Sequence, residues 1–260
     1  MPRRRGPATD VLVLCYHGVS ESWPSDLAVT PGQFERQLAG LRDAGYEGAT
    51  FTQAVHDPPS DRTVAVTFDD GFRSVLTKAA PILDRLALPA TVFVPTGFVG
   101  VEKPMRWPGV DQWAGTPHEG ELVPMSWEEL GTLRSKGWEI GSHGRTHPRL
   151  TQLSDEDLAA ELESSRQQCR TAGHECLAIA YPFGDVDERV VTAAQRAGYS
   201  GGAALPHPLL EAESPLRWPR IGVYRSEDDR RFRRKTSPLM RRLRRMRAWR
   251  LVQARHRVRR

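Results

Sequence analysis

Residues 64–71 read Val-Ala-Val-Thr-Phe-Asp-Asp-Gly, and this stretch says most about the architecture. Its apolar part, residues 64–68, predicts a buried strand that ends directly in two carboxylates and a glycine. In a parallel barrel the carboxyl ends of the strands face the active site, so we expect Asp69 and Asp70 to lie there. The alternative is an ordinary turn, because Asp and Gly are common turn residues.

Other short apolar runs predict further buried strands, and most of them precede a helical stretch. They cover residues 11–16, 91–95, 138–142 and 177–181, with further candidates at 201–205 and 221–224. Helix starts are indicated by Thr30 before Pro31, by Ser126 with Glu129 and by Ser154 with Asp157. Strands that alternate with helices over 260 residues predict one α/β domain built on a parallel sheet or barrel.

A pair of histidines follows the predicted strand at 138–142. His143 and His147 lie four residues apart in the sequence Ser-His-Gly-Arg-Thr-His. Neutral imidazoles bind Zn²⁺ well, and one carboxylate with two histidines leaves a fourth position open for water. An open position is typical of catalytic rather than structural zinc sites. The alternative is a pair of solvated loop histidines.

Two more motifs end predicted strands. The letters Ala-Tyr-Pro-Phe-Gly at 180–184 end one of them, and Cys-Tyr-His-Gly at 15–18 end the first. Taken alone, the former is typical of a turn, and His17 in the latter is typical of a hydrogen-bonded structural histidine. Because all four motifs lie at the carboxyl ends of predicted strands, they indicate one shared site at the rim of a barrel.

In combination, these motifs resemble those of the polysaccharide deacetylases with a NodB homology domain, carbohydrate esterase family 4. The TFDD motif of that family corresponds to residues 67–70, its two-histidine metal motif to 143–147 and its third motif to 181–184. The resemblance covers residues 11–225 and implies that the α/β fold is a distorted (β/α)7 barrel.

The resemblance also implies a role for each site residue. Asp69 would be the general base, and the backbone N–H of Phe183 would help to stabilise the oxyanion. A divalent metal ion would be held by Asp70, His143 and His147. Zn²⁺ is the expected cofactor, and Co²⁺, Ni²⁺ or Fe²⁺ also suit such a ligand set.

Two departures from the family pattern bear on catalysis. Many members carry an arginine that orients the base two residues before the proline of the third motif, where this chain has Ala180. Many also carry a late Leu-x-x-His motif with a catalytic acid; none follows residue 184, and His207 matches it poorly. The chain is most similar to the circularly permuted poly-N-acetylglucosamine deacetylase subgroup, which implies that His17 is the acid. Arg220 is the candidate to replace the missing arginine, and the alternative for it is a surface arginine.

We therefore expect a metal-dependent hydrolase that removes N-acetyl groups from an N-acetylated sugar or polysaccharide, with that glycan as its partner. Trp107 and Trp113, in the long segment 97–124, are candidate sugar contacts and are equally typical of residues that plug the loop. One rival function is an amidohydrolase of a small non-sugar amide on the same fold. Another is a metal-binding pseudoenzyme whose tail binds an anionic surface.

Charge is distributed unevenly along the chain, whose net charge is +5. Residues 230–260 contain 15 basic and no acidic residues, which leaves 22 basic and 32 acidic residues in 1–229. We therefore divide the chain into a basic leader at 1–10, the deacetylase-like domain at 11–225 and an Arg-rich tail at 226–260.

The tail is the part expected to meet an anionic partner. On a helix its apolar residues Leu239, Leu243, Met246 and Trp249 fall on one side, which predicts a helix lying on an anionic membrane surface; the alternative is a solvated tail. Nucleic acid is not expected as a partner, because no recognised binding motif is present. The cysteines form no CxxC pair, and no apolar run suits a signal peptide, so we expect a cytoplasmic protein peripheral to the membrane.

Overall fold

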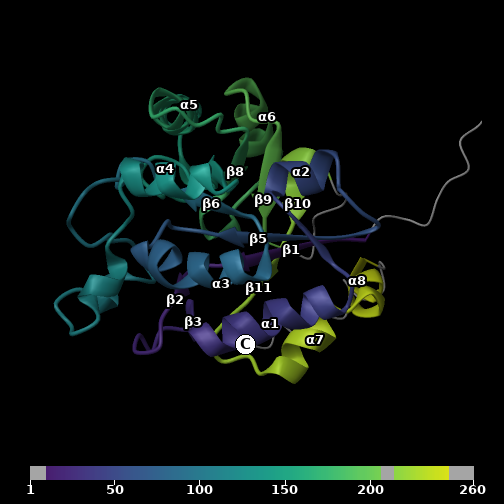
Figure 1. Cartoon of the computed structure of the whole chain (residues 1–260). Coiled ribbons are helices and arrows are strands. Elements are labelled where there is room, and N and C mark those ends of the chain that lie inside the picture. Colours follow the sequence, from purple (N-terminus) through teal and green to yellow (C-terminus); the bar gives the residue numbers. More distant parts are fainter. Residues whose placement is uncertain (1–9, 206–213, 246–260) are drawn as a thin grey trace, which may run out of the picture.

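The computed structural model describes residues 10–205 and 214–245. Parallel strands form one curved sheet, a nearly closed barrel, and helices pack around its outside (Figure 1). The strands of this sheet are β1 (Asp10–Tyr16), β4 (Glu47–Ala49), β5 (Arg62–Phe68), β6 (Ala90–Val94), β7 (Glu139–Ser142), β8 (Ala178–Ala180), β9 (Gly201–Ala204), β10 (Trp218–Pro219) and β11 (Ile221–Gly222). The distorted α/β barrel is thus confirmed, and every predicted strand is present. The sequence did not indicate β4 and β10, which have three and two residues.

One short segment brings the two ends of the sheet together. β10 pairs with β9, whereas β11, which begins two residues after β10 ends, pairs with β1. Arg220 lies between β10 and β11, and its backbone N–H donates to the carbonyl oxygen of Ala204 over 2.9 Å. Arg220 therefore belongs to the segment that closes the barrel.

Three of the helices begin where the sequence indicates. The helices are α1 (Pro31–Asp43), α2 (Phe51–His56), α3 (Ala80–Leu86), α4 (Trp127–Ser135), α5 (Asp155–Thr171), α6 (Glu188–Arg196), α7 (Asp229–Thr236) and α8 (Pro238–Arg245). The side chains of Thr30, Ser126 and Ser154 each accept a hydrogen bond from the backbone N–H three residues further on. Ser126 and Glu129 form a complete capping box, so these three predicted starts are confirmed.

The barrel interior is lined largely by small side chains. An apolar cluster there contains Ala65, Ala178, Ala180 and Ala203 together with the larger Phe93. The guanidinium group of Arg220 lies over the Phe93 ring, 5.6 Å from its centre. An arginine therefore reaches the interior from the closing segment rather than from position 180.

The long segment 97–124 packs beside the rim as a compact unit. It contains two short 3-10 turns, and the Met105 N–H donates to the Leu122 carbonyl oxygen over 3.0 Å. Its apolar residues join Trp23 in a cluster next to the small sheet of β2 (Gly18–Val19) and β3 (Ala28–Val29). Trp107 is only 8% exposed, so packing is the role that the structure gives it.

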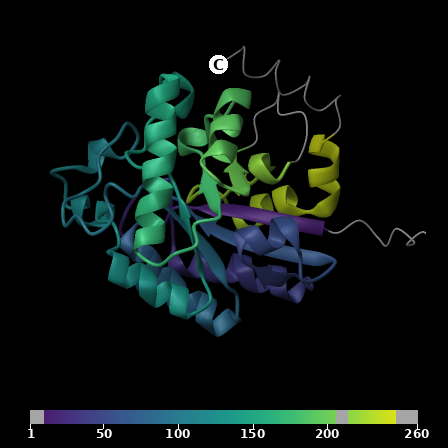
Figure 2. The ribbon, with the colours of Figure 1, turned by 90° about the horizontal axis from the view of Figure 1, so that it is seen from above.

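The folded body extends beyond the expected boundary at residue 225. Gln33 on α1 donates to the Glu227 carbonyl oxygen over 2.7 Å, and Phe232 on α7 is buried. Arg241 on α8 forms an ion pair with Asp10 at the start of β1, and Figure 2 shows the yellow α7 and α8 beside the purple β1. Residues 226–241 therefore pack on the domain, which composition did not indicate because arginines outnumber the few residues that make these contacts.

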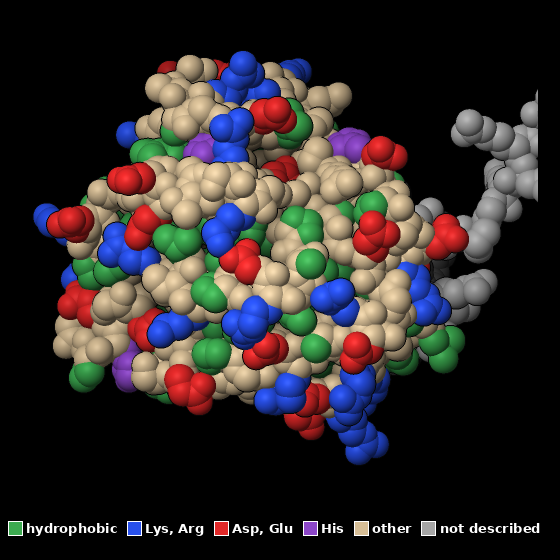
Figure 3. All heavy atoms as spheres, in the orientation of Figure 1, with side chains coloured by type: hydrophobic (Ala, Val, Ile, Leu, Met, Phe, Trp, Pro, Cys, Tyr) green, Lys and Arg blue, Asp and Glu red, His purple; other side chains and the backbone are tan. Residues whose placement is uncertain are grey.

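Within the described residues, the predicted amphipathic tail helix corresponds to α8, which begins at Pro238. Ser237 separates α7 from α8 with an extended backbone ahead of Pro238. Leu239 is 67% exposed, and Lys and Arg side chains gather at the lower edge of the face in Figure 3, where α7 lies. The side chains of Leu243, Met246 and Trp249 lie outside the described residues, as do His207 and the leader up to residue 9. Among the helices that are described, none combines the length and apolar character needed to cross a membrane.

Candidate active site and metal centre

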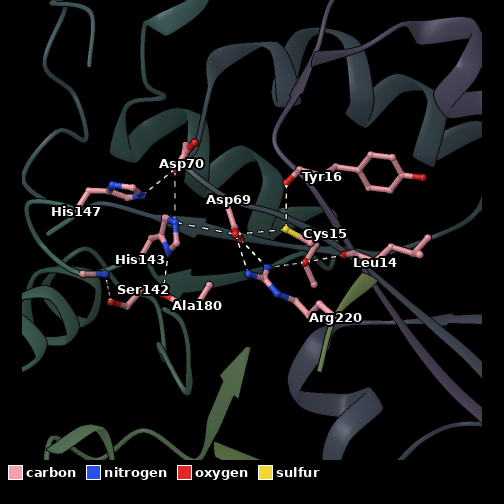
Figure 4. Close-up of polar contacts among 12 residues, drawn as sticks. Leu14, Cys15, Tyr16, Asp69, Asp70, Ser142, His143, His147, Ala180 and Arg220 are labelled. Atoms are coloured by element: carbon pink, nitrogen blue, oxygen red, sulfur yellow. Dashed lines mark hydrogen bonds and ion pairs between the residues drawn. The ribbon is translucent and has the colours of Figure 1, made fainter. Parts of the chain in front are cut away.

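The structure brings the predicted site residues together at the carboxyl ends of the strands (Figure 4). His17 follows β1, the two aspartates follow β5 and His143 follows β7. β1 and β5 pair in parallel so that Tyr16 lies opposite Phe68, which places the ends of both strands at the same level. The shared rim that the sequence predicted is therefore present.

Asp70, His143 and His147 face one point. Asp70 Oδ1 lies 3.5 Å from His143 Nε2 and 3.4 Å from His147 Nε2, and the candidate ligand atoms of all three lie within 4.8 Å of one another. All three side chains are buried. Asp70 Oδ1 has no hydrogen-bond partner among the described residues, which is costly for a buried carboxylate unless a cation binds it. The set therefore fits a divalent metal ion held by one carboxylate and two imidazoles.

The protonation states of Asp70 and His147 suit metal binding. Burial opposes the ionisation of Asp70, but the facing imidazoles hold its pKa well below the usual range. Burial lowers the pKa of His147, which favours the neutral ring that can bind a cation. Burial acts in the same direction on His143, but Asp69 and Asp70 raise its pKa above the usual value. A bound cation would oppose that protonation by charge repulsion.

Neighbouring groups orient both imidazoles. His143 Nδ1 lies 2.8 Å from the Ala180 carbonyl oxygen, so this nitrogen donates and Nε2 is left free to face Asp70. The Trp107 ring stacks on the His147 imidazole with ring centres 4.2 Å apart and planes inclined by 23°. Trp107 thus supports a candidate metal ligand, a contact that the sequence alone did not indicate.

Asp69 is held by Arg220. The two guanidinium nitrogens donate to the two carboxylate oxygens, each over 2.7 Å, and Arg220 also donates to Thr67 Oγ1 over 3.0 Å. Arg220 is fully buried, so it is not the surface arginine of the alternative. Burial works to raise the pKa of Asp69, but the charge and hydrogen bonds of Arg220, together with His143 and His17, outweigh it and lower that pKa to about 2.

His17 also lies beside Asp69. One ring nitrogen of His17, the Cys15 thiol and an Asp69 carboxylate oxygen lie within 4.8 Å of one another. A cation at this second set would be repelled by Arg220, which already pairs with both oxygens of Asp69. The buried His17 Nδ1 has no hydrogen-bond partner among the described residues, which speaks against a strand-capping role.

Phe183 lies in the turn after β8. Its backbone φ is 58°, an uncommon value for a residue with a side chain. Its ring packs against the His147 ring with centres 4.6 Å apart. The guanidinium group of Arg149 also lies over the Phe183 ring, 4.5 Å from the ring centre. Among residues 10–205 and 214–245, the Phe183 N–H has no hydrogen-bond acceptor, so this donor is available to a substrate oxygen.

The sequence did not indicate three residues that support the site, two through its backbone and one through Asp69. Glu161 and Ser165 on α5 bind the main chain of residues 144–146, and Cys15 donates its thiol hydrogen to Asp69 Oδ2 over 3.4 Å. Glu161 is one of several acidic residues on α5, and no local pattern separates it from the others. Cys15 lies in the motif at 15–18, two residues before His17, and this position was the sequence feature that could have indicated its role.

A parallel barrel whose rim carries a carboxylate with two histidines, and a second carboxylate held by arginine, is the NodB type of barrel. Residues 56–202 match the family model described as polysaccharide deacetylase. Because this segment is more than half of the chain, the chain belongs to the polysaccharide deacetylase family. His17 and Arg220 lie outside the matched segment and reach the site from β1 and from the closing segment.

Known proteins similar to this chain fit that assignment. The Bacillus subtilis (strain 168) protein YxkH is 26% identical over 73% of this chain. A poly-beta-1,6-N-acetyl-D-glucosamine N-deacetylase of Staphylococcus aureus (strain MSSA476) is 25% identical over 72% of it. The chain spans 62% of the first relative's length and 64% of the second's.

A solved structure shares the fold over most of the chain. The Streptococcus pyogenes deacetylase PplD, in complex with acetate, aligns with a TM-score of 0.72 at 22% identity. The alignment covers 89% of this chain and 100% of that structure. This similarity establishes the barrel architecture.

Proposed function

We propose that this protein is a metal-dependent hydrolase that removes N-acetyl groups from an N-acetylated sugar or polysaccharide. The observation that carries the proposal is the different surroundings of two adjacent aspartates. Asp70 faces two imidazoles, whereas Asp69 faces Arg220 and His17. One carboxylate is thus placed to hold a cation and the other to exchange a proton, which are the two tasks that amide hydrolysis sets.

Asp70, His143 and His147 would hold the metal ion, for which Zn²⁺ is the first candidate. When bound, the ion would lower the pKa of water and polarise the acetyl carbonyl, which compensates for the weak basicity of an aspartate with a pKa of about 2. The Arg220 pair keeps Asp69 ionised near pH 7 and fixes the direction of both carboxylate oxygens. Asp69 is therefore our candidate for the general base.

His17 is our candidate for the general acid. Its ring lies beside Asp69, and imidazole is the side chain that most often carries protons near neutral pH. Protonation of the departing amine by such a group typically accelerates a reaction about 10²–10⁴-fold. The free N–H of Phe183 would donate to the oxyanion, an interaction worth about 3–4 kcal/mol in other hydrolases.

The sugar substrate is supported by the relatives. One of them is named as a poly-beta-1,6-N-acetyl-D-glucosamine N-deacetylase, and the shared family is that of polysaccharide deacetylases. The two rival functions, an amidohydrolase of small amides and a pseudoenzyme, share the fold but differ in chemistry. The Arg220–Asp69 pair argues against the pseudoenzyme, because the arginine absent at position 180 is supplied from another strand.

The Arg-rich C-terminal part adds a second proposal about location. We propose that it brings the protein to an anionic membrane surface on the cytoplasmic side. Four exposed arginines of this part, together with the exposed Leu239, support that contact: Arg230, Arg231, Arg233 and Arg234. Basic side chains near such a surface contribute about 1 kcal/mol each.

Release of acetate from N-acetylglucosamine oligomers, with Zn²⁺ or with a chelator, tests the enzymatic proposal. We expect release that requires the metal and that is lost in Asp70→Asn. Release only from a small N-acetylated amino acid would instead favour the amidohydrolase. Binding of Zn²⁺ without release from any amide would favour the pseudoenzyme.

A further inference from the structure

The loop that carries both histidine ligands is bound from outside by helix α5. Glu161 Oε1 accepts the backbone N–H groups of Arg145 and Thr146, each over 2.6 Å. Glu161 Oε2 accepts the Thr146 hydroxyl hydrogen over 3.1 Å. The Glu161 side chain is only 8% exposed, so these bonds form largely away from water and are stronger for it.

A serine one turn further along α5 binds the same loop. Ser165 Oγ donates to the Gly144 carbonyl oxygen over 2.8 Å and lies 2.7 Å from Ser142 Oγ. Ser142 Oγ in turn accepts the Gly144 N–H over 3.1 Å. The backbone between His143 and His147 is therefore fixed by two side chains of one helix.

The loop needs this support because of its shape. Gly144 has a φ of 75° and His147 a φ of 60°, and such left-handed values are unfavourable for a residue with a side chain. A Cβ atom on Gly144 would lie 3.0 Å from Glu161 Oε1, so the carboxylate packs directly against the bend. All three groups that Glu161 binds are donors, which an ionised carboxylate can accept without a competing hydrogen of its own.

We propose that Glu161 is a positioning residue that sets the affinity of the site for its metal ion. By holding residues 144–146, it turns His143 and His147 toward Asp70. This inference rests on the proposed metal-dependent function. Groups that orient metal ligands in this way typically change affinity about 10–100-fold when they are removed.

A matched control lies at the opposite end of the same strand that leads to His143. Glu139, at the start of β7, also accepts three hydrogen bonds: from the Thr52 N–H, the Thr52 hydroxyl and the Thr91 hydroxyl. Its loss should destabilise the fold by a similar mechanism but should not disturb the histidine loop. Comparing the two glutamates therefore separates ligand positioning from general stability.

The test measures the Zn²⁺ dissociation constant of the full-length apo-protein by competition with a chromophoric chelator, together with the midpoint of thermal unfolding. We expect Glu161→Ala to bind Zn²⁺ about 10–100-fold more weakly than the wild type. Glu161→Gln should stay within a few-fold of the wild type, because its amide oxygen can still accept both N–H groups. Glu139→Ala should unfold at a lower temperature but bind Zn²⁺ with wild-type affinity.

Two results would overturn the inference. One is wild-type affinity in Glu161→Ala, and the other is an equal loss of affinity in Glu139→Ala. If Glu161→Ala does not fold, Ser165→Ala removes the hydrogen bonds to Gly144 and Ser142 and should still weaken Zn²⁺ binding several-fold. Unchanged affinity in that variant would also count against the inference. A wild-type protein that binds no Zn²⁺ would overturn the proposed function itself, which is a distinguishable outcome.

Discussion

The two ends of the barrel differ in how their polar groups are paired. At the amino end, the Glu139 carboxylate receives hydrogen bonds from Thr52 and Thr91, and the Thr91 hydroxyl accepts the Phe51 N–H over 2.8 Å. At the carboxyl end, Asp70 Oδ1, His17 Nδ1 and His147 Nδ1 are buried and have no partner among the described residues. Unpaired buried groups cost stability, so their concentration at one end indicates that a ligand completes them.

An orphaned atom alone does not mark a site. His174, which lies away from the carboxyl rim, is 4% exposed and neither of its ring nitrogens has a partner in the described part of the chain. It stacks on Trp127 with ring centres 5.9 Å apart, and it belongs to no group of three or more candidate metal ligands among the described residues. What distinguishes the rim is that the unpaired Asp70 Oδ1 faces the Nε2 atoms of both His143 and His147.

The largest expected effect comes from the rim. Asp69→Asn should lower kcat on an N-acetylated sugar about 10³–10⁴-fold, because the proton acceptor is lost. It should leave Zn²⁺ content unchanged, whereas His143→Ala should lose the metal. Glu139→Gln, at the amino end, is the control and should retain near-wild-type kcat. Nearly full activity in Asp69→Asn would show that Asp69 is not the proton acceptor and that the rim differs from the amino end for another reason.

His17→Ala should have the next largest effect. If His17 donates the proton, kcat/KM for an N-acetylated sugar should fall about 10²–10³-fold, while an activated acetate ester, whose leaving group needs little protonation, should lose much less. Equal losses on both substrates, accompanied by a lower unfolding temperature, would instead assign His17 a structural role. Parallel kinetics on the two substrates separate these outcomes.

Removal of the C-terminal helices tests how much their packing near the amino end of the barrel contributes to stability. Removal of 226–260 takes away buried Phe232 and the Arg241–Asp10 pair, so the unfolding free energy should fall by about 3 kcal/mol or more. Removal of 246–260 should leave stability and kcat near wild type and weaken binding to anionic vesicles. Urea unfolding and vesicle sedimentation check both statements; equal vesicle binding by the full chain and by the shorter one would argue against the membrane proposal.

The smallest expected effect is a pH dependence of the Asp69–Arg220 pair. The pKa of Asp69 is lowered to about 2 in the folded protein, so its ionised form stabilises the fold above pH about 4, and this contribution is lost as the pH falls toward 2. The shift corresponds to about 2 kcal/mol. In metal-free protein, the stability difference between the wild type and Asp69→Asn should therefore shrink by this amount between pH about 5 and 2. A difference independent of pH would show that the pair does not stabilise the rim.

Much of the fold and the candidate metal set could be predicted, because strand ends and ligands are close in sequence. Asp69 and Asp70 directly follow a buried strand, and His143 does the same. Arg220 could be named only as a candidate, since it lies 151 residues from Asp69 and no local pattern links them. The packing of Phe232 on the domain could not be predicted, because composition averages over a segment and overlooks single buried residues.

The place of Arg220 in the closing segment has a consequence for how the protein is made. A ribosome synthesises Asp70, His143 and His147 before it reaches Arg220. The growing chain therefore acquires every candidate ligand of the metal well before it acquires the residue that aims Asp69. On the proposed mechanism, a partly made chain would hold the candidate metal ligands before the residue that pairs with Asp69, and competence for hydrolysis would wait for one of the last strands to be translated.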